Sequence, residues 1–188
     1  MNDVKTTART RLVEAASRLF YAHGLTATGI DRVIAEAGVA KQSLYNNFAS
    51  KDELMQAYLD ERHEEWLNLY RARLEQAGSS RDRVLAVFDA YLDHAAGAYE
   101  QGFRGCGLLN AAAELPAGAA GRETVRKHKE QVQDLIAGHL AETGTPAPAL
   151  AEHLAFLLEG AMSRAGLESR PDLLRDARRI ASTLLDAP

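Results

Sequence analysis

The chain has 188 residues, of which 46% are hydrophobic and 26% charged, and its formal net charge is −4. This length fits one large domain or two small ones that share a core, and the apolar fraction excludes wholesale disorder. No apolar run approaches the roughly 18 residues of a membrane span, and no charged-then-apolar signal opens the chain. The single Cys106 cannot form an intrachain disulfide. We therefore expect a cytoplasmic protein without a membrane partner.

Apolar residues recur at three- and four-residue spacing along the whole chain, which predicts helices; no stretch shows the two-residue alternation of a strand. Glycines, prolines and capping residues divide this pattern into about nine segments. In chain order the predicted helices cover residues 7–23, 29–37, 40–46, 51–76, 81–99, 108–115, 121–142, 148–166 and 171–185. Thr28 is expected to cap the second helix, and Ser50 with Glu53 forms a capping box for the fourth.

The first three predicted helices match a helix-turn-helix. The turn between the second and third needs a small residue, a positive φ and an apolar residue packed under both helices, and Ala37, Gly38 and Val39 supply them. Residues 40–43 then stand at the N-terminal end of a recognition helix, where side chains reach base edges. The same pattern also fits an ordinary helical hairpin.

Charge is divided unevenly along the chain. Residues 1–51 contain seven basic and four acidic residues, a net charge of +3, whereas the rest contains 15 basic and 22 acidic residues, a net charge of −7. A basic first part on an acidic remainder suggests an anionic partner for the first part. Chance clustering on a solvated surface would give the same count.

Three stretches taken together are more specific: GLTATGI at 24–30, AGVAK at 37–41 and LYNNFASKDEL at 44–54. Residues 8–55 closely resemble the DNA-binding domain of TetR-family transcriptional regulators. The resemblance implies an all-α fold in which residues 1–50 form the DNA-binding domain and residues 51–188 a helical effector-binding and dimerisation domain. Two positions depart from the family pattern. Ala40 stands where Ser or Thr is frequent, and Asn47 stands where His or Tyr is common.

The same resemblance assigns DNA contacts. Thr28, Tyr45 and Lys51 would hold phosphates, whereas the bases would be read by Lys41, Gln42, Ser43 and Asn46. The chemistry of two of these residues suits phosphate binding. Tyr45 carries a hydroxyl on a rigid ring, and Lys51 lies at a helix N-terminus, where the amides and the helix dipole favour an anion. Packing between helices is the alternative for Tyr45. A basic arm of Lys5, Arg9 and Arg11 would follow the DNA, or would simply be a solvated terminus.

A single helix-turn-helix domain contacts few base pairs, so we expect a homodimer on a palindromic operator of double-stranded DNA. The last two predicted helices are the best candidates for the dimer surface, because they carry apolar stripes suited to an intermolecular four-helix bundle. The stripes comprise Leu150, Leu154, Leu157, Ala161, Leu173, Leu174, Ile180 and Leu184. Completion of the monomer's own core is the alternative.

In the second domain, several polar residues stand among apolar residues of the predicted helices. Buried carboxylates are costly unless paired, so these groups are candidates for an effector pocket with aromatic walls. The candidate effector-binding residues are Trp66, Tyr70, Phe88, Tyr91, His94, Asn110, Glu114, His128, Phe156 and Glu159. A structural pair of Glu114 and His128 is the alternative. A metal site of His94, Glu114 and His128 lacks a recognised ligand spacing, so no metal or cofactor is expected.

The sequence thus predicts a transcriptional regulator, in the first place a repressor that an unknown small-molecule effector releases from its operator. An activator would show the same features. The alternative is a small helical ligand-binding protein or enzyme that uses Glu114, His128 and Glu159. No nucleophile with an ordered base, phosphate-binding loop or metal motif supports catalysis, so we expect no enzyme.

Overall fold

The computed structural model describes residues 7–97, 101–142 and 147–186, and these residues form nine helices and no strand. The helices are α1 (Ala8–His23), α2 (Ile30–Ala37), α3 (Lys41–Asn47), α4 (Lys51–Leu74), α5 (Ser80–Ala95), α6 (Gly107–Glu114), α7 (Ala120–Ala141), α8 (Pro148–Glu168) and α9 (Asp172–Leu185). The all-α prediction is confirmed. The largest difference from the predicted helix ends is in α5, which ends at Ala95 rather than near residue 99.

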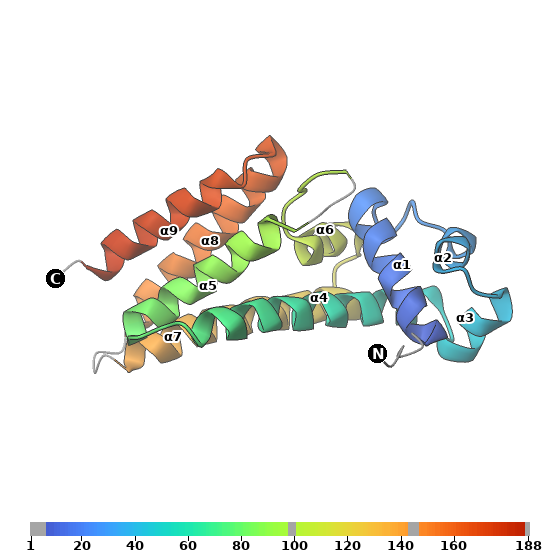
Figure 1. The fold of residues 1–188 in the computed structure, drawn as a ribbon, viewed down its shortest axis with the longest axis horizontal. Coiled ribbons are helices and arrows are strands. Elements are labelled where there is room, and N and C mark those ends of the chain that lie inside the picture. Colours follow the sequence, from blue (N-terminus) through green and yellow to red (C-terminus); the bar gives the residue numbers. More distant parts are fainter. Residues whose placement is uncertain (1–6, 98–100, 143–146, 187–188) are drawn as a thin grey trace, which may run out of the picture.

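The first three helices form a small head at one end of the elongated molecule (Figure 1). Gly38 ends α2 in the left-handed conformation, with φ of 60°, as the predicted turn requires. Ala37 is buried beside it, and α3 is anchored by Leu44, which is almost completely buried. The second helix begins differently from the prediction. Its N-cap is Gly29, which makes no side-chain capping bond, so Thr28 is not the cap.

Helix α4 connects the head to the body and is about 36 Å long at 1.5 Å per residue. The predicted cap is confirmed, because the Ser50 hydroxyl accepts a hydrogen bond from the Glu53 amide. At its head end α4 packs on α1, where the rings of Phe20 and Tyr58 meet edge to face at 5.5 Å. Farther along, α4 packs on α5 and α7, so one continuous helix contacts both parts of the molecule.

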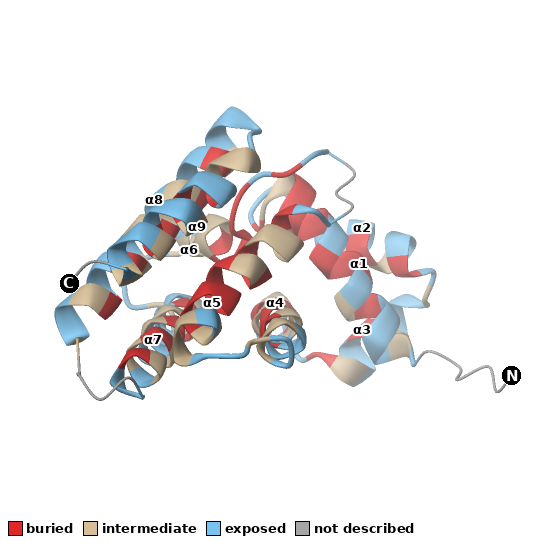
Figure 2. Cartoon of the chain, turned by 60° about the vertical axis from the view of Figure 1, so that its left-hand side comes forward, coloured by how far each residue is buried: buried red, intermediate tan, exposed pale blue. Residues whose placement is uncertain are grey.

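The body is a bundle of α4 to α9 whose buried residues lie between the helices (Figure 2). Helices α8 and α9 pack on each other and keep exposed residues along their outer faces. The predicted stripes are accordingly divided: Leu154 and Leu174 belong to the core, whereas Ile180 and Leu184 are exposed. Within the described ranges, no helix combines the length and the apolar character needed to cross a membrane.

Candidate DNA interface and effector cavity

Helix α3 presents polar side chains over a buried base. Leu44 and Phe48 are each 1% exposed and fix the helix against the rest of the head. On the other side Tyr45 is 52% exposed, so the sequence alternative of interhelix packing does not describe its side chain. Four of the predicted DNA contacts are exposed together on this short helix, namely Lys41, Gln42, Tyr45 and Asn46, whereas Ser43 is half-buried.

The exposed groups of α3 are bonded to near neighbours. Lys41 donates to Asp31 at 3.0 Å, and this carboxylate raises the pKa of the Lys41 ammonium. The Gln42 amide donates to the Asn46 amide oxygen at 3.0 Å. Exposed contacts of this kind contribute little to stability, so water or DNA can replace them at small cost.

Two residues that were predicted to bind phosphate, Thr28 and Lys51, bond instead to backbone carbonyls of the protein. Thr28 is fully buried, and its hydroxyl donates to the Gly24 carbonyl at 2.7 Å and to the Leu19 carbonyl at 3.4 Å. The expectation that the Thr28 side chain holds a phosphate therefore disagrees with the structure, since the hydroxyl ties the α1–α2 turn to α1. The Lys51 ammonium donates to the Leu25 carbonyl at 2.7 Å, although its side chain is only half-buried.

Two of the three residues of the predicted basic arm lie within the described part of the chain. Lys5 lies outside the described residues, whereas Arg9 and Arg11 are exposed on the first turn of α1. The Arg9 guanidinium lies over the Phe48 ring, 4.5 Å from its centre, so it packs on the head rather than extending from it.

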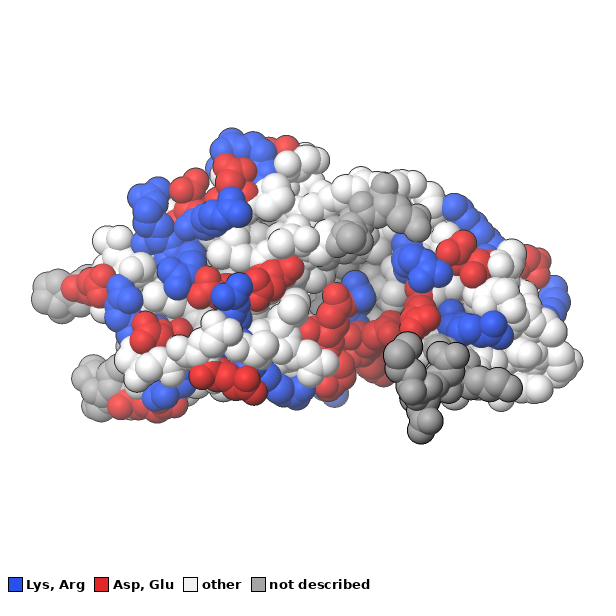
Figure 3. Space-filling model, in the orientation of Figure 1, with Lys and Arg blue, Asp and Glu red and all other residues white. Residues whose placement is uncertain are grey.

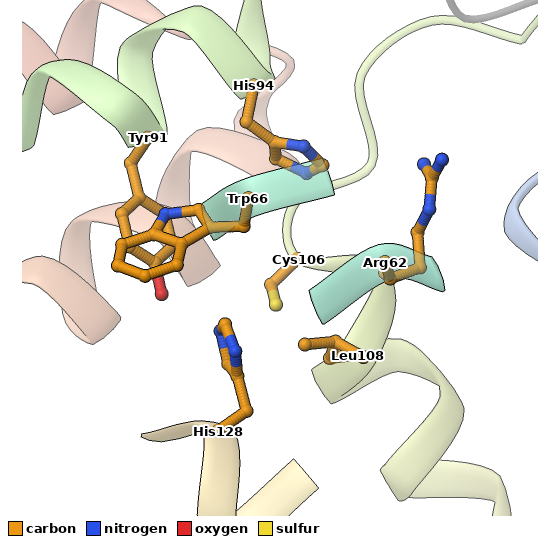
Figure 4. Close-up of a pocket in the computed structure, with 8 residues that line it drawn as sticks. Arg62, Trp66, Tyr91, His94, Cys106, Leu108 and His128 are labelled. Carbon is orange, nitrogen blue, oxygen red and sulfur yellow. The ribbon is translucent and has the colours of Figure 1, made fainter. Parts of the chain in front are cut away.

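A small cavity lies in the body between α4, α5, α6 and α7. Four predicted effector-binding residues line it, Trp66, Tyr91, His94 and His128, together with Arg62, Cys106, Gly107 and Leu108. Figure 4 shows these side chains around a common space, with the Cys106 thiol directed towards it and the Arg62 guanidinium directed away. The cavity measures about 20 Å³, which is room for about one water molecule. In this conformation it is therefore too small for any larger ligand.

A histidine pair lies at the edge of the cavity. The Nδ1 atoms of His63 and His128 are 2.7 Å apart, and the His128 ring meets Trp66 edge to face at 5.4 Å. Burial lowers the pKa of His128 to about 2, so its imidazole is neutral near pH 7. Burial likewise lowers the pKa of His94 to about 4. The predicted pair of Glu114 and His128 is wrong, since His128 bonds to a histidine of α4.

Lys129, the residue after His128, forms a second polar cluster. Its ammonium makes an ion pair with Glu159 at 2.8 Å and donates to the Tyr91 hydroxyl at 3.3 Å and the Cys106 thiol at 3.5 Å. Burial alone would lower the pKa of Lys129, but Cys106, Tyr91 and Glu159 outweigh it and raise this pKa well above its usual value. Glu159 therefore balances a buried cation and lies outside the cavity, in a surface groove that it shares with Phe156.

The remaining predicted effector residues do not line the cavity. Phe88 is fully buried core, Phe156 is 65% exposed on α8, and the Tyr70 hydroxyl bonds to His139. The Asn110 amide donates to the Arg104 carbonyl. Glu114 accepts hydrogen bonds from two backbone amides of the head and is exposed, so in this structure it lies outside the cavity. In the described part of the chain, no group of three metal-ligating side chains is found.

Sequence reasoning missed several lining residues, and one of them had a signal. Arg62 precedes Trp66 by four residues on one helix, so both share a face of α4. No comparable signal marks Gly107 and Leu108, which reach the cavity through the course of the 101–107 segment and the start of α6.

A three-helix head with an exposed third helix, carried on a helical body, defines a helix-turn-helix protein. Residues 12–58 match the family model described as bacterial regulatory proteins, tetR family. The probable transcriptional regulator ArpR of Pseudomonas putida is 37% identical over 86 residues, and the transcriptional activator FasR of Mycolicibacterium smegmatis is 35% identical over 85. These matches cover 43% and 45% of this chain but only 41% and 39% of those relatives.

A solved structure resembles nearly the whole chain. It is SCO4454, a TetR-family transcriptional regulator from Streptomyces coelicolor, which is 32% identical with a TM-score of 0.79. The alignment covers 93% of this chain and 90% of that one. The chain therefore belongs to the TetR family of bacterial regulatory proteins.

Proposed function

We propose that the protein is a ligand-responsive DNA-binding transcriptional regulator that binds a palindromic operator as a homodimer. The observation that carries this proposal is the surface of α3. Lys41, Gln42, Tyr45 and Asn46 are exposed together, while Leu44 and Phe48 beneath them hold the helix rigidly. Family membership supports the same function.

In this proposal α3 enters the major groove of DNA. Lys41, Gln42 and Asn46 reach base edges, with Ser43 beside them, and Gln42 can form two hydrogen bonds to adenine. Tyr45 donates to a phosphate from its exposed hydroxyl. Lys51 contributes its charge near the DNA backbone, and because its ammonium has three N–H donors it can bind a phosphate while it keeps its bond to the Leu25 carbonyl.

The proposed dimer uses α8 and α9. Their outer faces expose four large apolar side chains, Phe156, Leu167, Ile180 and Leu184. Exposed apolar residues gathered on two adjacent helices are typical of a subunit interface. Two copies joined there would place the two heads at a fixed separation, as a palindrome requires.

The proposed effector site is the cavity around Trp66 and His128. Aromatic rings and neutral imidazoles favour a largely apolar ligand with groups that accept or donate hydrogen bonds. Because the closed cavity holds about one water molecule, an effector binds only a conformation in which these helices have separated. Preference for that conformation is what would alter DNA affinity. We propose release of a repressor; a relative named as an activator shows that the opposite outcome occurs in similar proteins.

Selection from random DNA duplexes with the full chain tests this function. We expect enrichment of a sequence with two-fold symmetry, and a sedimentation mass of two chains at micromolar concentration. A control pool incubated with a chain carrying Tyr45→Ala and Gln42→Ala should show no enrichment. If the unaltered chain enriched no sequence, or bound as a monomer, the proposal would be wrong.

A further inference from the structure

Glu114 is the last residue of α6 in the body, yet its carboxylate binds the head. One oxygen accepts a hydrogen bond from the Leu25 amide at 2.9 Å, and the other accepts from the Thr26 amide at 2.8 Å. Leu25 and Thr26 belong to the turn between α1 and α2. Hydrogen bonds to an ionised acceptor are roughly twice as strong as neutral ones, so this contact fixes two consecutive residues of the turn.

The same turn is held from a second side. The Lys51 ammonium, on the first residue of α4, donates to the Leu25 carbonyl at 2.7 Å. Partial burial alone would raise the pKa of Glu114, but the amides of Thr26 and Leu25 together with the charge of Lys51 outweigh it and lower this pKa. Both backbone groups of Leu25 are thus bonded to charged side chains of different body helices.

Gly24 makes this approach possible. Its φ is 91°, and a Cβ atom at this position would lie 2.6 Å from a carboxylate oxygen of Glu114. The backbone conformation therefore requires glycine, and a side chain at this position would displace the Glu114 carboxylate from the turn.

The location of Glu114 is unfavourable for α6 itself. A negative charge at a helix C-terminus opposes the helix dipole, so a glutamate here lowers the intrinsic stability of α6. The side chain of Glu114 therefore does not stabilise its own helix. Its stabilising interaction is the one with the head.

The held turn leads directly into the DNA-reading helices. The Thr28 hydroxyl donates to the Leu19 carbonyl of α1, and α2 then begins at Ile30. Helix α2 packs on α3 and pairs with it through Asp31 and Lys41. The direction in which α3 faces therefore depends on where the turn is held.

Helix α6 also touches the cavity. Gly107 and Leu108 in its first turn line the cavity, and Glu114 lies seven residues after Gly107, about 10 Å along the helix. A shift of α6 needed to enlarge the cavity would move the carboxylate that holds the head.

We propose that Glu114 is a positioning residue for operator recognition, which fastens the α1–α2 turn to α6 and so sets the orientation of α3 for specific DNA. This inference rests on the proposed DNA-binding function. It assigns to Glu114 no contact with DNA or effector.

The test compares Glu114→Gln with the unaltered full chain on the duplex that the latter selects and on a random duplex. Glutamine keeps the size of the side chain but loses the charge and one acceptor. We expect about tenfold weaker binding of the selected duplex, with random-duplex affinity and dimer mass unchanged within error. Glu130→Gln, the same substitution on the exposed face of α7, is the matched control and should bind as the unaltered chain does.

Amide hydrogen exchange measured by NMR gives a second readout that needs no DNA. Exchange at Leu25 and Thr26 should become at least tenfold faster in Glu114→Gln and stay unchanged in Glu130→Gln. The inference is overturned if these amides exchange as before, or if selected and random duplexes lose affinity equally. If the unaltered chain selects no duplex, the proposed function fails as well, and the exchange data still report whether the contact exists.

Discussion

The head and the body use polar side chains in opposite ways. On α3 the polar groups are exposed and bonded to near neighbours, as in the pairs of Lys41 with Asp31 and Gln42 with Asn46. Around the cavity of the body, polar groups are largely removed from water and bonded across helices, as in His63 with His128 and Lys129 with Glu159. Exposed pairs can exchange for a new partner at little cost, whereas buried pairs resist separation because each partner would be left unsatisfied.

The difference also appears in the distribution of charge. Acidic side chains gather over α4 on the face shown in Figure 3, between the head and the far end of the body. The head therefore adjoins an acidic surface that repels DNA, which would restrict contact with DNA to the head. Four predictions test this contrast, from the largest expected effect to the smallest.

The largest effect is expected from the base of α3. Leu44→Ala removes a fully buried side chain and should lower the free energy of unfolding by about 3 kcal/mol, because it leaves a cavity under the recognition helix. Urea denaturation followed by circular dichroism measures it. Tyr45→Phe, one residue along on the exposed face, should change stability by less than about 0.5 kcal/mol. If both variants lost the same free energy of unfolding, the distinction between a buried and an exposed side of α3 would be wrong.

The next effect concerns the neutral His128. Its pKa of about 2 in the folded chain is below the ordinary value near 6.5, so below pH 6.5 only the unfolded chain gains a proton. The free energy of unfolding is therefore unaffected by His128 above pH 6.5 and falls as the pH drops below that value. Between pH 7 and pH 5 the loss should be about 2 kcal/mol.

Chemical denaturation at several pH values tests this dependence. His128→Gln should flatten the slope, whereas His153→Gln on the exposed surface of α8 should preserve it. An unchanged slope in His128→Gln would mean that His128 is not held neutral.

A smaller effect is expected at the exposed surface of α3, which we propose reads DNA. Gln42→Ala should weaken binding of the selected duplex by about 1.4 kcal/mol, or tenfold, and relax the preference at one base pair, because a bidentate contact is lost. Fluorescence anisotropy on the selected duplex and its single-base variants measures both effects. Gln131→Ala on α7 is the control. Uniform weakening on every variant would instead indicate a phosphate contact.

The smallest effect is expected from Asp31. Asp31→Asn removes an exposed carboxylate and frees Lys41, so stability should change by less than about 0.5 kcal/mol. DNA affinity should rise a few-fold at low salt, and the gain should shrink at high salt. Glu36→Gln, also on α2 but paired with Arg18, serves as the comparison. Lower affinity in Asp31→Asn would show that the pair orients Lys41 for binding.

The fold was predictable because local signals mark it. Gly38, Ser50 and the helical apolar spacing set the helix ends and the head turn, and the structure agrees with them. The partners of polar residues were not predictable in this way. Asn110 and Glu114 do share a face of α6, as their spacing predicted, but that face meets the 101–107 segment and the head rather than the cavity. Helical periodicity tells which residues share a face and leaves open which element lies opposite.

The hydrogen bonds around Tyr21 bear on how the two parts could be exchanged between proteins. Its hydroxyl donates to the Gly105 carbonyl at 3.1 Å and accepts from the Arg104 amide at 2.7 Å, while the Arg104 guanidinium binds the carbonyls of Tyr21 and Ala22. A chimaera in which residues 1–50 came from a head without this tyrosine would leave the Gly105 carbonyl and the Arg104 amide without the Tyr21 hydroxyl. Transplanting the head with its native geometry therefore means transplanting the 104–114 segment as well, although that segment lies more than fifty residues further along the chain.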